Sequence, residues 1–173
     1  MEFKRLTGGH HELFPKAMDL YKESFPLHEQ RLPQSQQAIM SHPQYHFNLI
    51  YEGDIWIGLM LNWETDEYIY VEHFCILPEM RNKRYGQRAL ELLLSQGKPV
   101  ILEIDPPVDE VSIHRQGFYQ RSGFVSNAFS HVHPPYRAGF AGHPLVVMSC
   151  PEALTEAQYQ AFARHLAETV MGI

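Results

Sequence analysis

FCILPEMRNKRYGQRAL, residues 74–90, decides the fold because it joins two kinds of element through a basic turn. Its apolar start is typical of a strand, and Pro78 ends that strand. From Tyr85 onward, apolar residues recur at the spacing of one helical face. The stretch therefore predicts a strand, a turn and a helix in succession.

The turn predicts an anion site. The first N–H groups of a helix have no partner within it and the helix dipole adds positive potential, so a phosphate gains hydrogen bonds and charge stabilisation there. Gly86 has no side chain to keep a phosphate away from the backbone. Four basic residues crowd the same turn: Arg81, Lys83, Arg84 and Arg88. The alternative is a plain helix start whose exposed first turn the arginines solvate.

The residues before this stretch predict helices and an antiparallel meander. Turn residues at 52–54 and 65–66 separate runs rich in aromatic and β-branched residues, which favours neighbouring antiparallel strands. Pro26 stops the first helix, and Pro43 closes a second, weaker one. The expected elements are a strand at 2–6, helices at 13–25 and 28–42, and strands at 45–51, 55–63 and 67–77.

The residues after the stretch alternate between strands and helices. Asp109 is expected to cap one helix and Gly123 to end it, while Thr155 and Gln158 form a capping box for the last helix. The expected elements are a helix at 85–96, a strand at 99–104, a helix at 109–122, strands at 124–132 and 145–149, and a helix at 155–170. This order predicts an α/β (α+β) class, a mixed sheet with helices on its faces.

Composition limits the function classes. With 173 residues and 45% hydrophobic content, the chain is expected to bury one core as a single domain over 1–173. A net charge of -6 argues against a nucleic-acid partner, whose binding needs clustered Lys and Arg. No apolar run approaches the roughly 20 residues of a membrane span. The N-terminus lacks the pattern of a secretion signal, so a cytoplasmic location is expected.

Two motifs together resemble the GNAT family of N-acetyltransferases. Arg81–Gly86 is similar to the family's coenzyme A loop, Arg/Gln-x-x-Gly-x-Gly/Ala, with Arg84 in place of the first glycine. Phe118–Phe124 is similar to the family's Tyr-x-x-x-Gly-Phe element, where a helix ends and a strand begins. The resemblance covers residues 45 to about 149. It implies a mostly antiparallel sheet of about six to seven strands, helices on both faces, and central strands that splay to admit the cofactor.

The resemblance implies acetyl-coenzyme A (acetyl-CoA) as the cosubstrate. Ser112 stands where the family often has an asparagine that contacts the cofactor. The implied cofactor contacts are Phe74, Cys75, Ile76, Arg81, Asn82, Lys83, Arg84, Tyr85, Gly86, Gln87, Ser112 and Tyr119.

The resemblance also implies direct attack of an amine on the thioester. Tyr119 matches the general acid that protonates the departing thiolate. For the base, the resemblance favours Glu72, because the family commonly has a glutamate on this strand, and His73 is the alternative. Strand alternation places the two on opposite faces, so only one is expected to face the site. The acceptor is expected to be a primary amine of a small molecule or peptide, and its candidate contacts are Glu29, His133 and Tyr136.

Other interpretations stay open. One is a coenzyme A sensor without turnover, and another is a thiol acyl enzyme that uses Cys75 with His73. Cys75 and Cys150 both lie in apolar runs, where an unpaired cysteine is usually a small buried hydrophobe. Scattered histidines such as His131 and His143 invite a metal, but without His-Glu-x-x-His or Cys-x-x-Cys none is expected. A monomer or homodimer is expected.

Overall fold

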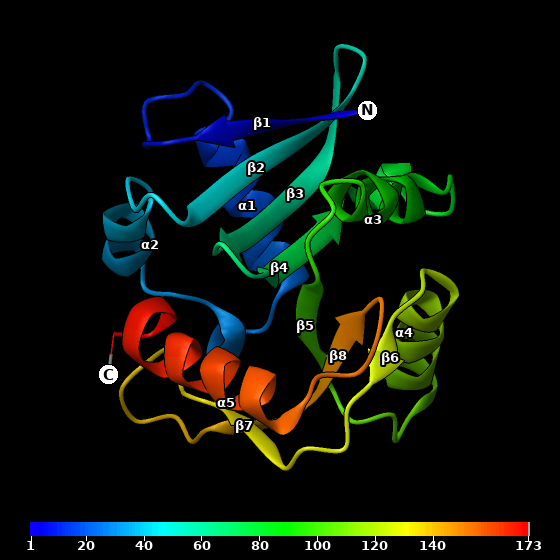
Figure 1. Cartoon of the computed structure of the whole chain (residues 1–173). Helices are drawn as coiled ribbons and strands as arrows, with labels where there is room; N and C mark the ends of the chain where they lie inside the picture. The colour runs from blue at the N-terminus through cyan, green and yellow to red at the C-terminus, as the bar shows by residue number, and fades with distance from the viewer. Residues whose placement is uncertain (173) are drawn as a thin grey trace. The chain divides into compact units, whose positions relative to one another are not determined.

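The computed structural model describes residues 1–172. The chain divides into two compact units, Met1–Lys98 and Pro99–Ile173. Figure 1 labels their helices and strands. The expectation of a single domain stays a prediction.

The first unit contains an antiparallel sheet in the order β1-β2-β3-β4. Its strands are β1 (Glu2–Leu6), β2 (Tyr45–Glu52), β3 (Ile55–Glu64) and β4 (Ile69–Ile76). The predicted hairpin of β2 and β3 is confirmed, with a tight turn in which Gly53 has φ 57°. Glycine adopts this left-handed backbone without strain.

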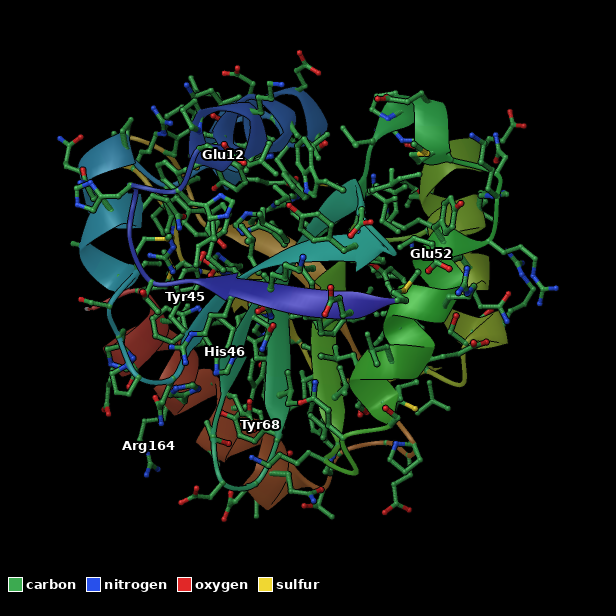
Figure 2. All side chains as sticks on the ribbon, turned by 90° about the horizontal axis from the view of Figure 1, so that it is seen from above. Glu12, Tyr45, His46, Glu52, Tyr68 and Arg164 are labelled. Atoms are coloured by element: carbon green, nitrogen blue, oxygen red, sulfur yellow. The ribbon has the colours of Figure 1, made fainter. Side chains whose placement is uncertain are left out.

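Helices cover both faces of this sheet. They are α1 (Phe14–Ser24), α2 (Pro33–Ile39) and α3 (Tyr85–Leu94), with 3-10 turns η1 (Leu27–Glu29) and η2 (Pro78–Met80). Figure 2 shows α1, which follows the labelled Glu12, and α3 on opposite sides of the strands. The helix expected at 28–42 is shorter because Pro33 fits the first turn of a helix but not its interior.

Cover on two faces explains the burial pattern of the central strands. Ile57, Leu59, Leu61 and Trp63 of β3 are all buried, and so are their neighbours in between. A strand with one solvated face would alternate between buried and exposed residues instead.

The second unit is organised around its longest strand. Its elements are β5 (Val100–Ile104), α4 (Glu110–Arg121), β6 (Val125–Ser126), β7 (His131–His133), β8 (His143–Cys150), α5 (Glu156–His165) and the π-helical turn η3 (Leu166–Val170). β8 pairs antiparallel with β5, β6 and β7. The predicted N-cap at Asp109 and the predicted capping box at Thr155 are both present, and Asp109 forms a capping box of its own with Ser112.

The strand expected at 124–132 is two short strands, so the described residues form eight strands rather than six to seven. Asn127 interrupts it. Its side-chain amide donates to Val147 O at 3.2 Å and to Ser149 Oγ at 3.0 Å, and its Oδ1 accepts from Leu154 N at 2.7 Å. An asparagine that bonds backbone groups in this way competes with a regular strand.

The α/β class and the mostly antiparallel pairing are confirmed. Splayed central strands stay a prediction. Over residues 1–172, no helix combines the length and the apolar character that a membrane crossing requires.

Candidate functional site

The turn before α3 passes through two left-handed residues. Asn82 has φ 61°, and Arg84, the N-cap of α3, has φ 62°. This backbone costs a residue with a side chain about 1 kcal/mol, whereas glycine adopts it freely. The expected glycine at this position therefore has a physical reason, and Arg84 keeps the same backbone. Its side chain is exposed, so it does not fill the turn.

The N-terminus of α3 has no side-chain cap. The first backbone bond of the helix runs from Arg88 N to Arg84 O at 3.1 Å, so the amides of the first turn have no acceptor inside the helix. By contrast, α4 and α5 each begin with a capping box. Aligned amides without a cap form a site for a phosphate.

Three cations surround this helix start without an acidic partner. Arg81, Lys83 and Arg84 are exposed and form no ion pair with any residue in the described part of the chain. Arg81 instead donates from Nε to Ile76 O at 3.1 Å, which fixes its side chain across the turn. Arg88 is neutralised, because its Nη2 donates to Glu52 Oε1 at 2.8 Å and lowers the pKa of that carboxyl.

These features fit the pyrophosphate of coenzyme A. The amides of Tyr85, Gly86 and Gln87 have no acceptor inside the helix, and three exposed cations lie beside them, which is the combination that a pyrophosphate requires. Asn82 is exposed in the same turn.

The end of β4 carries the other cofactor residues expected in this unit. Phe74 and Ile76 are half-buried, while Cys75 is buried between them. Gly58 on β3 lies so close to β4 that an added Cβ would stand 2.3 Å from Cys75 O.

Burial raises the pKa of the Cys75 thiol to about 11, so the thiol is protonated at neutral pH and is a poor nucleophile.

A β-bulge lies in β4 at Glu72. Val71 pairs with Asn62 and His73 pairs with Leu61, so Glu72 is an extra residue without its own partner on β3. The prediction that alternation separates Glu72 and His73 onto opposite faces is wrong for this reason. A bulge resets the alternation of a strand.

Both residues contact the short segment 29–31. The Glu72 side chain is fully buried, and its carboxylate accepts from Arg31 Nε at 2.9 Å and Trp63 Nε1 at 2.8 Å. His73 Nε2 lies 2.8 Å from the carbonyl oxygen of Glu29, to which it donates. The Glu29 carboxylate itself lies 3.6 Å from His28 Nε2.

Sequence reasoning missed Arg31. It is separated from Glu72 by 41 positions, and no helical or strand spacing connects the two. The signal in the sequence is weak: Arg31 is the single arginine in a short segment that starts at Pro26-Leu27 and ends at Leu32-Pro33.

Tyr119 occupies a defined position at the C-terminus of α4. Gly123 N donates to Gln120 O at 3.0 Å and Phe124 N donates to Tyr119 O at 3.1 Å, the pattern of a Schellman motif. Gly123 has φ 93°, which this motif requires. The rings of Tyr119 and Phe124 are 5.7 Å apart and make the apolar contact that accompanies it. The Tyr-x-x-x-Gly-Phe element is thus a helix stop that orients the tyrosine.

Ser112 belongs to the capping box of α4. Its Oγ donates to Asp109 Oδ1 at 2.8 Å and accepts from Asp109 N at 3.1 Å. Ser112 N also donates to Asp109 Oδ1 at 2.8 Å, and this backbone bond, followed by the bond from the Ser112 hydroxyl, lowers the pKa of the Asp109 carboxyl. Ser112 precedes Tyr119 by seven residues, about two helical turns, so both lie on one face of α4.

A surface cavity of about 340 Å³ opens beside Ser112. It lies along the α4 face that continues to Tyr119 two turns later. Its lining residues are Asp105, Pro106, Val108, Asp109, Val111, Ser112 and Arg115.

The histidines of β7 are buried and serve different purposes. The ring of His131 is held from both sides, with Nδ1 3.0 Å from Tyr159 OH and Nε2 bonded to the Glu103 carboxylate. His133 Nδ1 lies 2.6 Å from Pro134 O, and its ring stacks on Tyr136 with centroids 4.7 Å apart. Because both nitrogens of His131 are bonded, the two histidines do not form a matched metal-binding pair.

The fold and this site fit a class of α/β proteins that bind a phosphorylated cofactor at a helix N-terminus. The sequence profile of the Acetyltransferase (GNAT) family matches residues 12–124. The chain therefore belongs to the GNAT family of acetyltransferases, as predicted.

Solved structures agree with this family. A protein from Bacteroides thetaiotaomicron, named as a GNAT-family acetyltransferase, is 32% identical with a TM-score of 0.93 over 100% of this chain and 99% of that chain. ElaA of Escherichia coli is 17% identical, with a TM-score of 0.57 over 86% of this chain and 99% of that chain. An aminoglycoside 6'-N-acetyltransferase solved with coenzyme A is 15% identical, with a TM-score of 0.58 over 86% of this chain and 96% of that chain.

No curated protein matches the chain by sequence. Family membership confirms the prediction of acetyl-CoA as cosubstrate.

Proposed function

We propose that this protein transfers the acetyl group of acetyl-CoA to a primary amine of a small molecule or peptide. The observation that carries the proposal is the start of α3, where uncapped amides meet three cations without acidic partners. Such a site binds phosphate oxygens through both hydrogen bonds and charge.

The proposed roles of the cofactor residues follow from their positions. Arg81, Lys83, Arg84 and the amides of residues 85–87 hold the pyrophosphate, with Asn82 at the rim of the turn. In the first unit, the β4 backbone at 74–76 is a further proposed contact of the cofactor. In the second unit, Ser112 of α4 is a proposed contact by itself. When bound, acetyl-CoA supplies the acetyl thioester that the amine attacks.

Tyr119 is the proposed general acid. Its phenol, with a reference pKa near 10, can give a proton to a departing thiolate. The Schellman motif supports this role because it holds the tyrosine at a fixed place at the end of α4. Tyr119→Phe keeps the ring contact with Phe124 and removes only the proton donor.

The contacts of Glu72 and His73 favour positioning roles over proton transfer. Arg31 and Trp63 hold the Glu72 carboxylate, and His73 Nε2 holds the backbone of Glu29. Both therefore order segment 29–31, where Glu29 is a proposed acceptor contact. The prediction that one of the two is the base stays open to test.

The acceptor class is supported by analogy with one relative. By its name, the aminoglycoside 6'-N-acetyltransferase acts on an amino group of a small molecule. In this chain Tyr136 and His133 are the proposed acceptor contacts in the second unit. A cytoplasmic location and a monomeric or dimeric state stay predictions.

A thiol acyl enzyme is the weaker candidate. The buried Cys75 thiol has a pKa raised to about 11, so little thiolate forms at neutral pH. A coenzyme A sensor without turnover differs from the enzyme only in its chemistry, which makes turnover the deciding measurement.

An acetyl-transfer screen tests the proposal. The panel contains spermidine, lysine, an aminoglycoside and a peptide with a free N-terminus, and the readout is thiol released from acetyl-CoA. Amine-dependent release that Tyr119→Phe slows by about 10²-fold or more supports the proposal. Cofactor binding without release for any amine favours the sensor.

A further inference from the structure

The buried ring of His133 holds a nitrogen that the protein itself does not satisfy. His133 is 4% exposed, and its Nε2 is buried without a hydrogen-bond partner among residues 1–172. Leaving such an atom unpaired destabilises the fold, because the buried nitrogen has lost its hydrogen bond to water. A cost of this kind calls for an explanation, and a ligand group that pairs with the nitrogen provides one.

The backbone fixes which nitrogen carries the hydrogen. His133 Nδ1 lies 2.6 Å from Pro134 O, and a carbonyl oxygen only accepts, so Nδ1 donates in this bond. In neutral imidazole the lone pair is then at Nε2. Nε2 is therefore an acceptor that can receive an N–H group or the proton of an ammonium.

A series of contacts links His133 to the helix face that carries Tyr119. His133 is directly opposite His143 in the β7–β8 pair, and such partners project to the same face of the sheet. His143 Nε2 lies 3.2 Å from Asp105 Oδ1, and Asp105 Oδ2 accepts from Arg115 Nη1 at 2.9 Å. Arg115 precedes Tyr119 by one helical turn.

The contact with Tyr136 does not use the ring plane that contains the Nε2 lone pair. Tyr136 covers a face of the imidazole, with an interplanar angle of 28°, whereas the lone pair lies in the ring plane. In the second unit, the titratable and charged groups on this side are Tyr136, His143 and, through His143, Asp105 with Arg115.

Two other candidate bases, Glu72 and His131, are engaged, and His73 uses its Nε2 to donate to Glu29 O. Arg31 and Trp63 hold Glu72, and both ring nitrogens of His131 are bonded. His133 combines a fixed tautomer, burial and an unsatisfied acceptor.

We propose that His133 is the general base of the acetyl transfer and binds the acceptor as a protonated primary amine, R–NH3⁺. This inference rests on the proposed function. His133 Nε2 takes one proton from the ammonium, and the freed nitrogen lone pair forms the bond to the acetyl carbon as the carbon–sulfur bond breaks. Tyr119 gives its phenolic proton to the sulfur and takes the second proton from the acceptor nitrogen. His133 then releases its proton to water.

A matched pair of variants tests this role. His133→Gln removes the base, and His114→Gln changes an exposed histidine of α4 as the control. The readouts are the pH profile of kcat/KM with the best amine of the panel and the thermal shift caused by acetyl-CoA. We expect His133→Gln to lower kcat/KM about 10²- to 10⁴-fold at pH 7 and to lose the acidic limb of the profile. Its cofactor-induced shift should match that of wild type.

A His133→Gln variant within about three-fold of wild type, with the acidic limb intact, overturns the proposal. Nitrogen NMR of the histidine-labelled wild type is independent of turnover and of whether the variant folds. It should show a pyridine-type Nε2 for His133 at neutral pH, shifted by the same amine. A pyrrole-type Nε2, or a signal that no amine of the panel moves, also overturns it. Wild type that neither binds acetyl-CoA nor turns over contradicts the proposed function instead.

Discussion

At the scale of single residues, the site keeps its geometry although one expected residue is missing. Arg84 takes the left-handed backbone that a glycine would take, and its side chain points to solvent with Nη2 3.4 Å from Gln87 Oε1. Arg84 therefore costs the turn a small amount of conformational energy and adds a cation beside the proposed phosphate site.

Arg84→Gly should separate stability from affinity. Relief of the left-handed backbone offsets the added chain entropy of glycine, so the free energy of unfolding should change by less than about 1 kcal/mol. The lost cation should weaken acetyl-CoA binding several-fold, to about ten-fold. Urea unfolding and calorimetric titration measure the two quantities. Unchanged affinity would show that Arg84 does not contact the cofactor.

The Cys75 thiol should be inert at neutral pH. Burial raises its pKa to about 11, so the thiolate fraction becomes significant only in strongly alkaline solution. We expect alkylation by iodoacetamide at pH 7 to be slow for the folded protein and fast in denaturant. Cys75→Ala should retain acetyl transfer, and a complete loss of turnover in this variant despite normal folding would revive the thiol mechanism.

At the scale of elements, the Schellman motif that ends α4 also positions Tyr119, the proposed general acid. The residues that end the helix, Gly123 and Phe124, also define where Tyr119 is held. Similarly, the bulge in β4 directs Glu72 and His73 to one segment, which regular alternation would not do.

Gly123→Ala should therefore reduce both stability and turnover. Its φ of 93° is unfavourable for alanine, which should cost about 1–2 kcal/mol. Gly97→Ala is the matched control, because Gly97 has φ 79° after α3 and open space around it. The control should lose similar stability in urea unfolding with unchanged kcat. Equal kcat in both variants would argue against a link between the helix stop and Tyr119.

At the scale of the whole molecule, local signals predicted most elements and distant contacts escaped prediction. The α3 start, the hairpin and the two capping boxes are encoded by neighbouring residues. The Arg31–Glu72 ion pair, the bulge and the break at Asn127 depend on residues far apart in the sequence. The unsatisfied nitrogen of His133 is likewise visible only when burial and partners are known.

The stability of the molecule should fall in mild acid partly because of His46, labelled on β2 in Figure 2. Burial and then Arg5 lower its pKa in the folded state. The unfolded state therefore binds more protons below its own pKa of about 6.5, and the free energy of unfolding decreases as pH falls through that value. His46→Gln should flatten the dependence between about pH 5 and 7. A slope identical to wild type would contradict this assignment.

Calorimetric titration with acetyl-CoA tests the central claim most directly. The test variant changes Arg81, Lys83 and Arg84 to glutamine, and the control changes three exposed cations elsewhere, Lys16, Lys22 and Arg164. Both variants lose the same charge. Wild type and control should bind with a Kd below about 1 mM, and the test variant should bind at least about ten-fold more weakly. Absence of binding by wild type, or equal affinity of the two variants, would contradict the account.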